Sequence, residues 1–284
     1  MFRQQSFVNN RPILYIIATP IGNLSEISPR VIEAINDSKC IFCEDTRVSG
    51  QLLLHLNIKK ELYSAYENIE KQSSLKVLEY LNNNYNVAFM SDAGYPGISD
   101  PGHIIIKEAI SHDFNVVVVN GPSALIHSLI ASGLDTTHFY FYGFLNPISS
   151  QRKKELEGLK TFKDTMIFYQ SPHKIKACLE DMYEIFGDRY VCLCRELTKK
   201  FEEFIRGNIS EIIPICETLK GEMVLVVKGY EQINKEVDLN SLIPLVDKLI
   251  KEGYYKKDAI VKIAKENNVN KKELYQLYHN LKGE

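Results

Sequence analysis

Short, unbroken runs of apolar residues recur in the first part of the chain, and each leads into an irregular, more polar segment. The four runs lie at residues 14–18, 40–43, 87–90 and 116–119. Such runs are typical of strands that are buried on both faces of a sheet. Helix-like patterns begin at Ser28-Pro29 and cover 51–56 and 74–81, and a further strand is expected at 62–66. The alternation predicts βαβ units and a mostly parallel sheet within residues 1–119.

A more aromatic and alternating pattern begins at about residue 139. Strands are predicted at residues 139–144, 165–169, 190–194, 201–205 and 223–227. A helix is expected to open at Ser171-Pro172-His173, between the second and third of these strands. We interpret residues 120–231 as a second α/β domain with a mixed, more antiparallel sheet, joined to the first through residues 120–132.

The end of the chain has the spacing of amphipathic helices, after a polar linker at 234–240. The three apolar stripes consist of Leu245, Val246, Leu249 and Ile250; Ile260, Ile263 and Ala264; and Leu274, Leu277, Tyr278 and Leu281. They predict a small helical module at 238–284, with a turn at 267–270, that is similar to a helix-turn-helix unit. RNA contact and a packing or dimerisation role are both open for this module.

One irregular segment, residues 91–102, is unusually rich in residues that fix the backbone. It reads Ser91-Asp92-Ala93-Gly94-Tyr95-Pro96-Gly97-Ile98-Ser99-Asp100-Pro101-Gly102. Asp100 can cap the following helix and Pro101 suits its first position. Comparable loops follow the other strands at 19–24, 44–47 and 120–124. Because ligands of open α/β sheets bind beyond the carboxyl ends of the strands, we expect these four loops to share one crevice.

The composition adds limits to this picture. The 284 residues are 45% hydrophobic, enough for a substantial core, and the formal net charge of −2 does not by itself indicate nucleic-acid binding. No segment reaches the roughly 18 apolar residues of a membrane helix, and the first residues lack the apolar core of a signal peptide. We therefore expect a cytoplasmic protein that has no membrane partner.

Clusters of basic residues and the cysteines are the remaining candidates for binding sites. Basic residues cluster at Arg152, Lys153 and Lys154, and again at Arg195, Lys199, Lys200 and Arg206. Such clusters can contact phosphates, although many are only solvated surface. The six cysteines include one C-x-x-C pair without a second half, so we expect buried thiols and no metal site.

The order of these segments resembles one family. The residues that carry the resemblance are Ala18-Thr19-Pro20-Ile21-Gly22-Asn23-Leu24, Glu44-Asp45-Thr46-Arg47, the loop at 91–102, Gly121-Pro122-Ser123-Ala124, Ser171-Pro172-His173, and the block at 195–207. They span nearly the whole chain, which is similar to the tetrapyrrole methylase superfamily and, within it, to ribose methyltransferases of ribosomal RNA. The resemblance implies a two-domain tetrapyrrole-methylase-like fold and a homodimer. It also implies 2′-O-methylation of a cytidine in the decoding region of small-subunit (16S) ribosomal RNA.

Four residues depart from the family pattern. Tyr95 stands where threonine is usual, Asn120 where proline is usual, Gln170 where glutamate is usual, and Lys174 where arginine is usual. A tyrosine is much bulkier than a threonine, so the loop at 91–102 must close differently here. Gln170 removes a carboxylate and argues against a general base at that position.

The resemblance also implies S-adenosylmethionine as the methyl donor, bound between the two domains. The residues implied to hold it are Pro20, Gly22, Asp92, Ala93, Gly94, Ile98, Ser123 and Ala124. Asp92 suits the donor's ammonium or sulfonium charge, and the Gly94 and Ser123 amides suit its carboxylate and adenine. A nicotinamide dinucleotide is disfavoured because no G-x-G-x-x-G follows the first strand.

Transfer of a methyl group to a ribose hydroxyl needs alignment with the donor and a base or cation beside the oxygen. We favour Asp45 and Arg47 as the catalytic pair, since their loop is expected to face the donor. A helix cap at Asp45 and an ion pair at Arg47 are the structural alternative. The other candidate bases are Glu44, Glu67 and Glu196.

Arg152, Lys153, Arg195, Lys199 and Arg206 are the candidates for contacts with RNA phosphates, with a structural role as the alternative for the strand edge at 195–200. Two other functions remain open. One is a methyltransferase of the same fold that acts on a tetrapyrrole precursor or on diphthine. The other is an RNA-binding protein without enzymatic activity. The basic block at 195–207 favours the RNA methyltransferase over the first, and the intact loop at 92–94 argues against the second.

Overall fold

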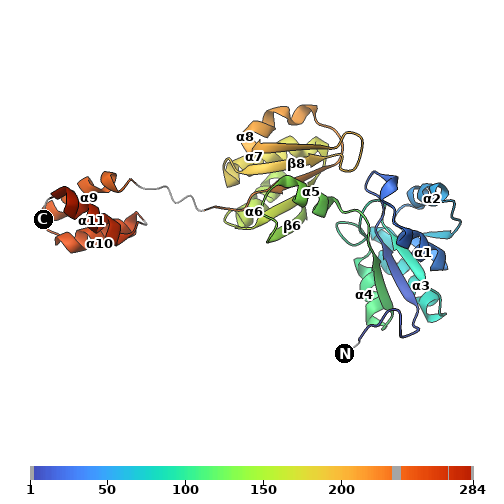
Figure 1. The fold of residues 1–284 in the computed structure, drawn as a ribbon. Coiled ribbons are helices and arrows are strands. Elements are labelled where there is room, and N and C mark those ends of the chain that lie inside the picture. Colours follow the sequence, from blue (N-terminus) through green and yellow to red (C-terminus); the bar gives the residue numbers. More distant parts are fainter. Residues whose placement is uncertain (1–2, 232–237, 268, 283–284) are drawn as a thin grey trace. The chain divides into compact units, whose positions relative to one another are not determined.

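A computed structural model describes residues 3–231, 238–267 and 269–282. The chain forms two compact units, Met1–Tyr230 and Glu231–Glu284 (Figure 1). The first unit contains two five-stranded sheets. The division of this unit into domains at 1–119 and 120–231 stays a prediction.

The first sheet is parallel throughout, as its apolar strands predict. Its strands are β1 (Ile13–Ile17), β2 (Cys40–Cys43), β3 (Glu61–Ser64), β4 (Val87–Met90) and β5 (Asn115–Val119), in the order β3-β2-β4-β1-β5. Tyr15 and Ile17 pack on one face and Leu14 and Ile16 on the other, so β1 is buried from both sides. This burial explains why β1 and β4 have no alternating polar residues.

Four helices cover this sheet. They are α1 (Pro29–Asp37), α2 (Thr46–His55), α3 (Glu70–Asn82) and α4 (His103–Ser111), and short 3-10 turns occur at Leu24–Glu26 and Glu67–Ile69. The apolar residues of α1 and α2 share one core with the sheet, and those of α3 and α4 share the other. Helix α2 begins at Thr46 and not at residue 51, because the Asp45 side chain accepts the Arg47 N–H at 2.8 Å and caps it.

The second sheet is mixed, as predicted. Its strands are β6 (Phe139–Phe144), β7 (Thr165–Gln170), β8 (Tyr190–Arg195), β9 (Glu203–Asn208) and β10 (Met223–Val227). The order is β6-β7-β10-β8-β9, and only β6 and β7 run parallel. The last strand in sequence, β10, therefore lies at the centre of the sheet.

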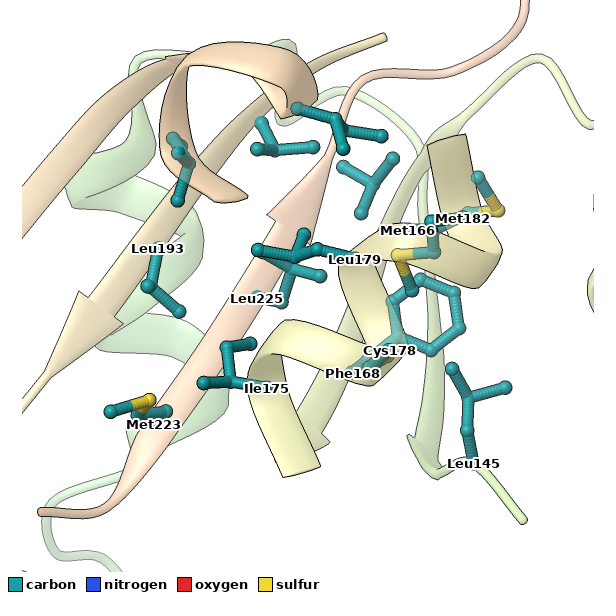
Figure 2. Close-up of a cluster of buried hydrophobic side chains, with 14 of the residues drawn as sticks. Leu145, Met166, Phe168, Ile175, Cys178, Leu179, Met182, Leu193, Met223 and Leu225 are labelled. Carbon is teal, nitrogen blue, oxygen red and sulfur yellow. The ribbon is translucent and has the colours of Figure 1, made fainter. Parts of the chain in front are cut away.

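The helices of this second half are α5 (Ala124–Ser132), α6 (Ser149–Leu159), α7 (Ile175–Phe186) and α8 (Ile209–Ile212), with 3-10 turns at Pro172–Lys174 and Ile213–Thr218. On one face of the sheet, Phe168, Leu193 and Leu225 from three neighbouring strands pack against Leu179 and Met182 of α7 (Figure 2). Leu129 of α5 packs against the other face. The sheet is thus covered on both sides, and its loops are left to form a site at its edge.

The second unit consists of α9 (Leu239–Lys251), α10 (Lys256–Glu266) and α11 (Lys271–Lys282), which confirms the helical module. Its core includes Leu242, Val246, Ile260 and Leu274. The predicted stripes are wrong in part, because Leu245 and Leu281 are 43% and 56% exposed. The apolar face of α9 instead runs through Leu242 and Ile243. Of the predicted linker at 234–240, residues 234–237 lie outside the described residues, and residues 239–240 already belong to α9.

Candidate functional site

A cavity of about 450 Å³ lies where loops of the first sheet meet the second sheet. Its wall is formed by Ile21, Ala93, Gly94, Tyr95, Ile98, Ser99, Asp100, Ser123, Ala124, Leu125, Phe144, Tyr169, Gln170, Ser171, Pro172, Leu197, Glu222, Met223 and Val224. The loops after β1, β4 and β5 therefore share one cavity, as predicted. The loop after β2, residues 44–47, was expected there and does not line it. The size and mostly apolar wall are typical of a small-molecule site.

The loop between β4 and α4 supplies much of this wall and has a tightly fixed backbone. The Gly97 N–H donates to the Pro101 carbonyl at 3.0 Å, and Ser99 adopts a left-handed conformation with φ 66°. Gly102 has φ 136°, and a Cβ there would lie 2.8 Å from the Phe89 ring, so no other residue fits. Such conformations persist only where the surroundings hold them, and they are common at binding sites.

A buried carboxylate on another helix anchors this loop. Glu70, the first residue of α3, is 5% exposed, and its Oε1 accepts the N–H groups of Gly102 at 2.9 Å and Ile104 at 2.7 Å. The prediction that Asp100 caps the helix is wrong, because α4 begins at His103 and its free amides are bound by Glu70. Asp100 is left to face the cavity.

Two contacts join the loops around the cavity. Thr19 and Gly94 exchange backbone hydrogen bonds of 2.9 and 3.0 Å. The Tyr95 hydroxyl lies 3.2 Å from both the N–H and the carbonyl oxygen of Gly121. A Cβ on Gly121 would lie 2.9 Å from Ala18, so the β1 and β5 loops approach closely. The bulk of Tyr95 is thus accommodated by a bridge between loops. The predicted use of the Gly94 amide for the donor is wrong, since Thr19 already accepts it.

The residues implied for the donor fall into two groups. Those that line the cavity are Ala93, Gly94, Ile98, Ser123 and Ala124. Pro20, Gly22 and Asp92 do not line it, although Ile21, between the first two, does. A Cβ on Gly22 would lie 2.4 Å from Cγ of Lys199, which places that side chain directly against the β1 loop. The assignment of all eight to a donor stays a prediction.

Three carboxylates at this edge of the sheet have raised pKa values. Burial, followed by the charges of Glu44 and Asp92, raises the pKa of Asp100 to about 6. Burial is also the main cause that raises the pKa values of Glu44 and Asp92. Asp92 Oδ1 accepts the Asp45 N–H at 3.2 Å, whereas the Asp100 side chain has no hydrogen bond or ion pair with any described residue.

Asp45 and Arg47, the predicted catalytic pair, form the helix cap and the ion pair that were the structural alternative to catalysis. Asp45 caps α2, and its Oδ2 lies 2.6 Å from a guanidinium nitrogen of Arg47, whose side chain is 87% exposed. Arg47 lowers the pKa of Asp45 to about 2, which weakens the carboxylate as a base. Catalysis by the pair stays a prediction. The other candidate bases, Glu44, Glu67 and Glu196, do not line the cavity either.

One of the basic residues on α6 is held inside the molecule. Arg152 is 3% exposed, and its Nε donates to Asp181 of α7 at 2.7 Å. Its guanidinium also reaches the Asn146 carbonyl oxygen at 3.2 Å. This burial removes Arg152 from any surface that could meet RNA, and we no longer propose it for that role. Lys153 pairs with Glu184 at 2.6 Å and remains about one-third exposed.

Three basic residues of the block at 195–207, Arg195, Lys199 and Arg206, also bind groups of the first unit. Arg195 binds Glu203 at 2.8 Å and the Lys220 carbonyl at 2.9 Å. Lys199 binds Glu196 at 3.1 Å and Glu222 at 2.8 Å. Arg206 donates to the Ala131 and Ser132 carbonyls at the end of α5. The block therefore joins the second sheet to the loops beside it, and its RNA contacts stay a prediction.

Several residues of the cavity were missed because they come from the second sheet. Tyr169 and Gln170 end β7, and Met223 and Val224 begin β10, which pairs with β7 so that Met223 lies opposite Gln170. The signal that could have found them is the motif Ser171-Pro172-His173, directly after an apolar strand. Antiparallel pairing of β10 could not be inferred from sequence separation alone.

All six cysteines are unpaired and buried, and the described residues contain no cluster of side chains able to hold a metal ion. No helix in the described ranges has the length and apolar character needed to cross a membrane.

Relatives in sequence match nearly the full chain, and two of them show the range. The chain is 41% identical over 289 residues to "Ribosomal RNA small subunit methyltransferase I" of Bacillus subtilis (strain 168), covering 98% of this chain and 99% of the relative. It is 38% identical to the protein of the same name from Vibrio cholerae, covering 94% of each. The similarity thus extends over both sheets and the C-terminal helices.

Solved structures share the fold of the two sheets. The methyltransferase CobJ matches with a TM-score of 0.58 at 15% identity, over 77% of this chain and 94% of its own. Uroporphyrin-III-C-methyltransferase from Thermus thermophilus gives 0.56 at 17%, over the same shares. The model of the tetrapyrrole (corrin/porphyrin) methylases matches residues 13–213, which include the loops and most of the strands that build the cavity. With this match and its relatives at about 40% identity, the chain belongs to the tetrapyrrole methylase family.

Proposed function

We propose that this methylase transfers a methyl group from S-adenosylmethionine to small-subunit ribosomal RNA, at the ribose 2′-hydroxyl of a cytidine in the decoding region. The observation that carries the proposal is the 41% identity to a ribosomal RNA methyltransferase over 98% of the chain. That identity includes the C-terminal helices, which lie beyond the part matched by the general family model.

The cavity suits the donor in size and chemistry. Ile21, Ile98 and Leu125 offer apolar contacts for an adenine ring, and the first amides of α5, after the Ser123 cap, suit a carboxylate. The donor supplies a methyl group on a positively charged sulfur. Asp100 is the carboxylate of the cavity loop that lines this wall, while Asp92, at the start of the same loop, accepts the Asp45 N–H and supports the loop.

The RNA binds through cations at the surface of the first unit. We retain Lys153, Arg195, Lys199 and Arg206 for phosphate contacts. Arg47, held by Asp45 and largely exposed, acts with it on the acceptor, where a cation can bind phosphate or stabilise developing negative charge. We also retain a homodimer in a cytoplasmic setting as part of the proposal.

The first test is donor binding. Titration calorimetry with S-adenosylmethionine and with its demethylated product should show micromolar affinity, about −8 kcal/mol. No binding at millimolar ligand would contradict an enzymatic role and favour a protein that only binds RNA.

The second test identifies the acceptor. Tritiated methyl groups should enter small ribosomal subunits from cells that lack the modification, and one linkage of their RNA should then resist alkaline hydrolysis. Methyl transfer to a tetrapyrrole precursor with none to RNA would contradict the proposal and favour the other branch of the family.

A further inference from the structure

The tip of the hairpin formed by β8 and β9 exposes an aromatic ring beside a cation. The Glu202 N–H donates to the Lys199 carbonyl at 3.1 Å and closes a turn whose two central residues are Lys200 and Phe201. Phe201 is 66% exposed, and the Lys200 ammonium lies 5.7 Å from the centre of its ring. Lys200 makes no hydrogen bond or ion pair with any described residue, so its charge can bind an anion.

The residues on either side of this exposed pair are held in place. Before the pair, Lys199 binds Glu222 at 2.8 Å, and its aliphatic stem lies against Gly22 in the loop after β1. After the pair, a carboxylate oxygen of Glu202 lies 3.2 Å from Nε2 of His127 on α5. The turn is thus attached to two neighbouring elements, and a surface that is already ordered loses little conformational entropy when it binds a partner.

The turn lies close to the cavity. Leu197, in the same loop, and Glu222, which binds Lys199, both line the cavity wall. Lys200 follows Leu197 by three positions, so their Cα atoms are at most about 11 Å apart. A polymer with one unit in the cavity therefore has neighbouring units within reach of Lys200 and Phe201.

We propose that Phe201 stacks on an unpaired base of the substrate RNA and that Lys200 binds a phosphate beside that base; the proposal rests on the proposed function. Proteins hold single-stranded RNA by stacking its bases on exposed aromatic rings and by placing cations along its backbone. Lys200 and Phe201 supply both groups at adjacent positions. They would hold a nucleotide near the one that is methylated.

The test of stacking compares Phe201 variants in filter binding to unmethylated small subunits and in single-turnover methyl transfer. Phe201→Ala removes the ring, so the affinity should fall about 10-fold or more. The rate at saturating subunits and the affinity for S-adenosylmethionine should change less than about threefold, because the ring contributes to substrate binding and not to the chemical step. Phe201→Trp keeps a flat aromatic face and should retain the affinity, whereas Phe201→Leu should lose as much as Phe201→Ala.

Phe139→Ala is the matched control. Phe139 is 42% exposed at the start of β6 and does not line the cavity. Its removal should leave subunit binding and methyl transfer at wild-type levels.

Lys200→Gln tests the phosphate contact through the dependence of subunit affinity on salt. Loss of one phosphate contact should make the slope of log affinity against log salt shallower by about 0.7, while Phe201→Ala should weaken binding without a change of slope. An unchanged slope for Lys200→Gln would overturn the assignment of Lys200.

Wild-type subunit affinity of Phe201→Ala would overturn the stacking proposal. Full affinity of Phe201→Leu would also overturn it, and would show an apolar contact with a ribosomal protein in place of stacking. A tenfold loss of donor affinity in Phe201→Ala would make the ring a support of the cavity. If wild-type protein transfers no methyl group to RNA, the proposed function itself fails, whereas active wild-type protein with unchanged binding by Phe201→Ala refutes this inference alone.

Discussion

Asp45 and Asp100 belong to neighbouring loops, yet their surroundings shift their pKa values in opposite directions. Arg47 stabilises the ionised form of Asp45 through a 2.6 Å ion pair on the surface. Burial and the charges of Glu44 and Asp92 destabilise the ionised form of Asp100. One carboxylate therefore favours the folded state when it is charged, and the other opposes it.

This difference predicts that Asp100→Asn stabilises the protein above pH 6. The folded-state pKa of Asp100, about 6, lies above its unfolded value, so ionisation costs stability as the pH rises from about 4 to 7. Allowing for screening of a half-exposed group, we expect a gain of about 1 kcal/mol at pH 8 and almost none near pH 4. Urea unfolding at several pH values measures it.

In the same experiment, Asp113→Asn, at a described aspartate beyond the other end of α4 that does not line the cavity, controls for the loss of a carboxylate in general. If Asp100→Asn instead lowers the free energy of unfolding equally at every pH, the carboxylate makes a favourable contact in the folded protein. That result would contradict a raised pKa of Asp100 in the folded protein.

At the scale of elements, Glu70 connects helices α3 and α4, which are far apart in the sequence. It opens α3, yet its carboxylate binds the amides that begin α4, directly after the cavity loop. A carboxylate at a helix N-terminus satisfies free amides and interacts favourably with the helix dipole. The position of the cavity loop therefore depends on a residue about thirty positions earlier in the chain.

We predict that Glu70→Ala lowers the free energy of unfolding by about 2 kcal/mol, since it leaves buried amides without an acceptor. It should also weaken donor binding, because the loop at 91–102 loses its anchor. Glu70→Gln keeps an acceptor oxygen and should lose less of both. Urea unfolding and titration calorimetry measure the two effects, with exposed Glu79→Ala on the same helix as the control. Equal stability of Glu70→Ala and Glu79→Ala would refute the anchoring role.

The strands were predictable because a strand that is buried on both faces has an unbroken run of apolar residues. The runs at 40–43 and 87–90 match β2 and β4 residue for residue. The rule that ligands bind beyond strand ends also located three of the cavity's loops.

What could not be predicted depends on partners that are distant in the chain. Nothing near Arg152 in the sequence shows that it will pair with Asp181 in the interior. Nothing near Gln170 shows that Met223 will lie opposite it in the sheet. Asp100 looked like a cap because helix-start signals are local, whereas its competitor, Glu70, acts from another helix. The identity of a side chain's partner is a property of the fold and not of the segment.

At the scale of the whole molecule, the two units have separate cores. Leu242, Ile260 and Leu274 pack within the C-terminal unit, and no described residue of that unit lines the cavity.

A chain truncated after Tyr230 should consequently keep its affinity for S-adenosylmethionine. It should bind small subunits more weakly, and the slope of log affinity against log salt should become shallower, because phosphate contacts made by the lysines of α10 and α11 are lost. Calorimetry and filter binding at several salt concentrations measure these quantities. Loss of donor binding on truncation would show that the C-terminal unit supports the first unit structurally.

The central position of β10 has a consequence for how the protein is made. Until residues 223–227 leave the ribosome, β7 and β8 have no strand between them, and each has an unpaired edge. The first sheet can fold while synthesis continues, because all of its strands precede residue 120. The second sheet cannot complete its pairing until its central strand, β10, has been synthesised. The same strand supplies Met223 and Val224 to the wall of the cavity. A nascent chain therefore acquires its ligand site in a single late step, almost at the end of the first unit.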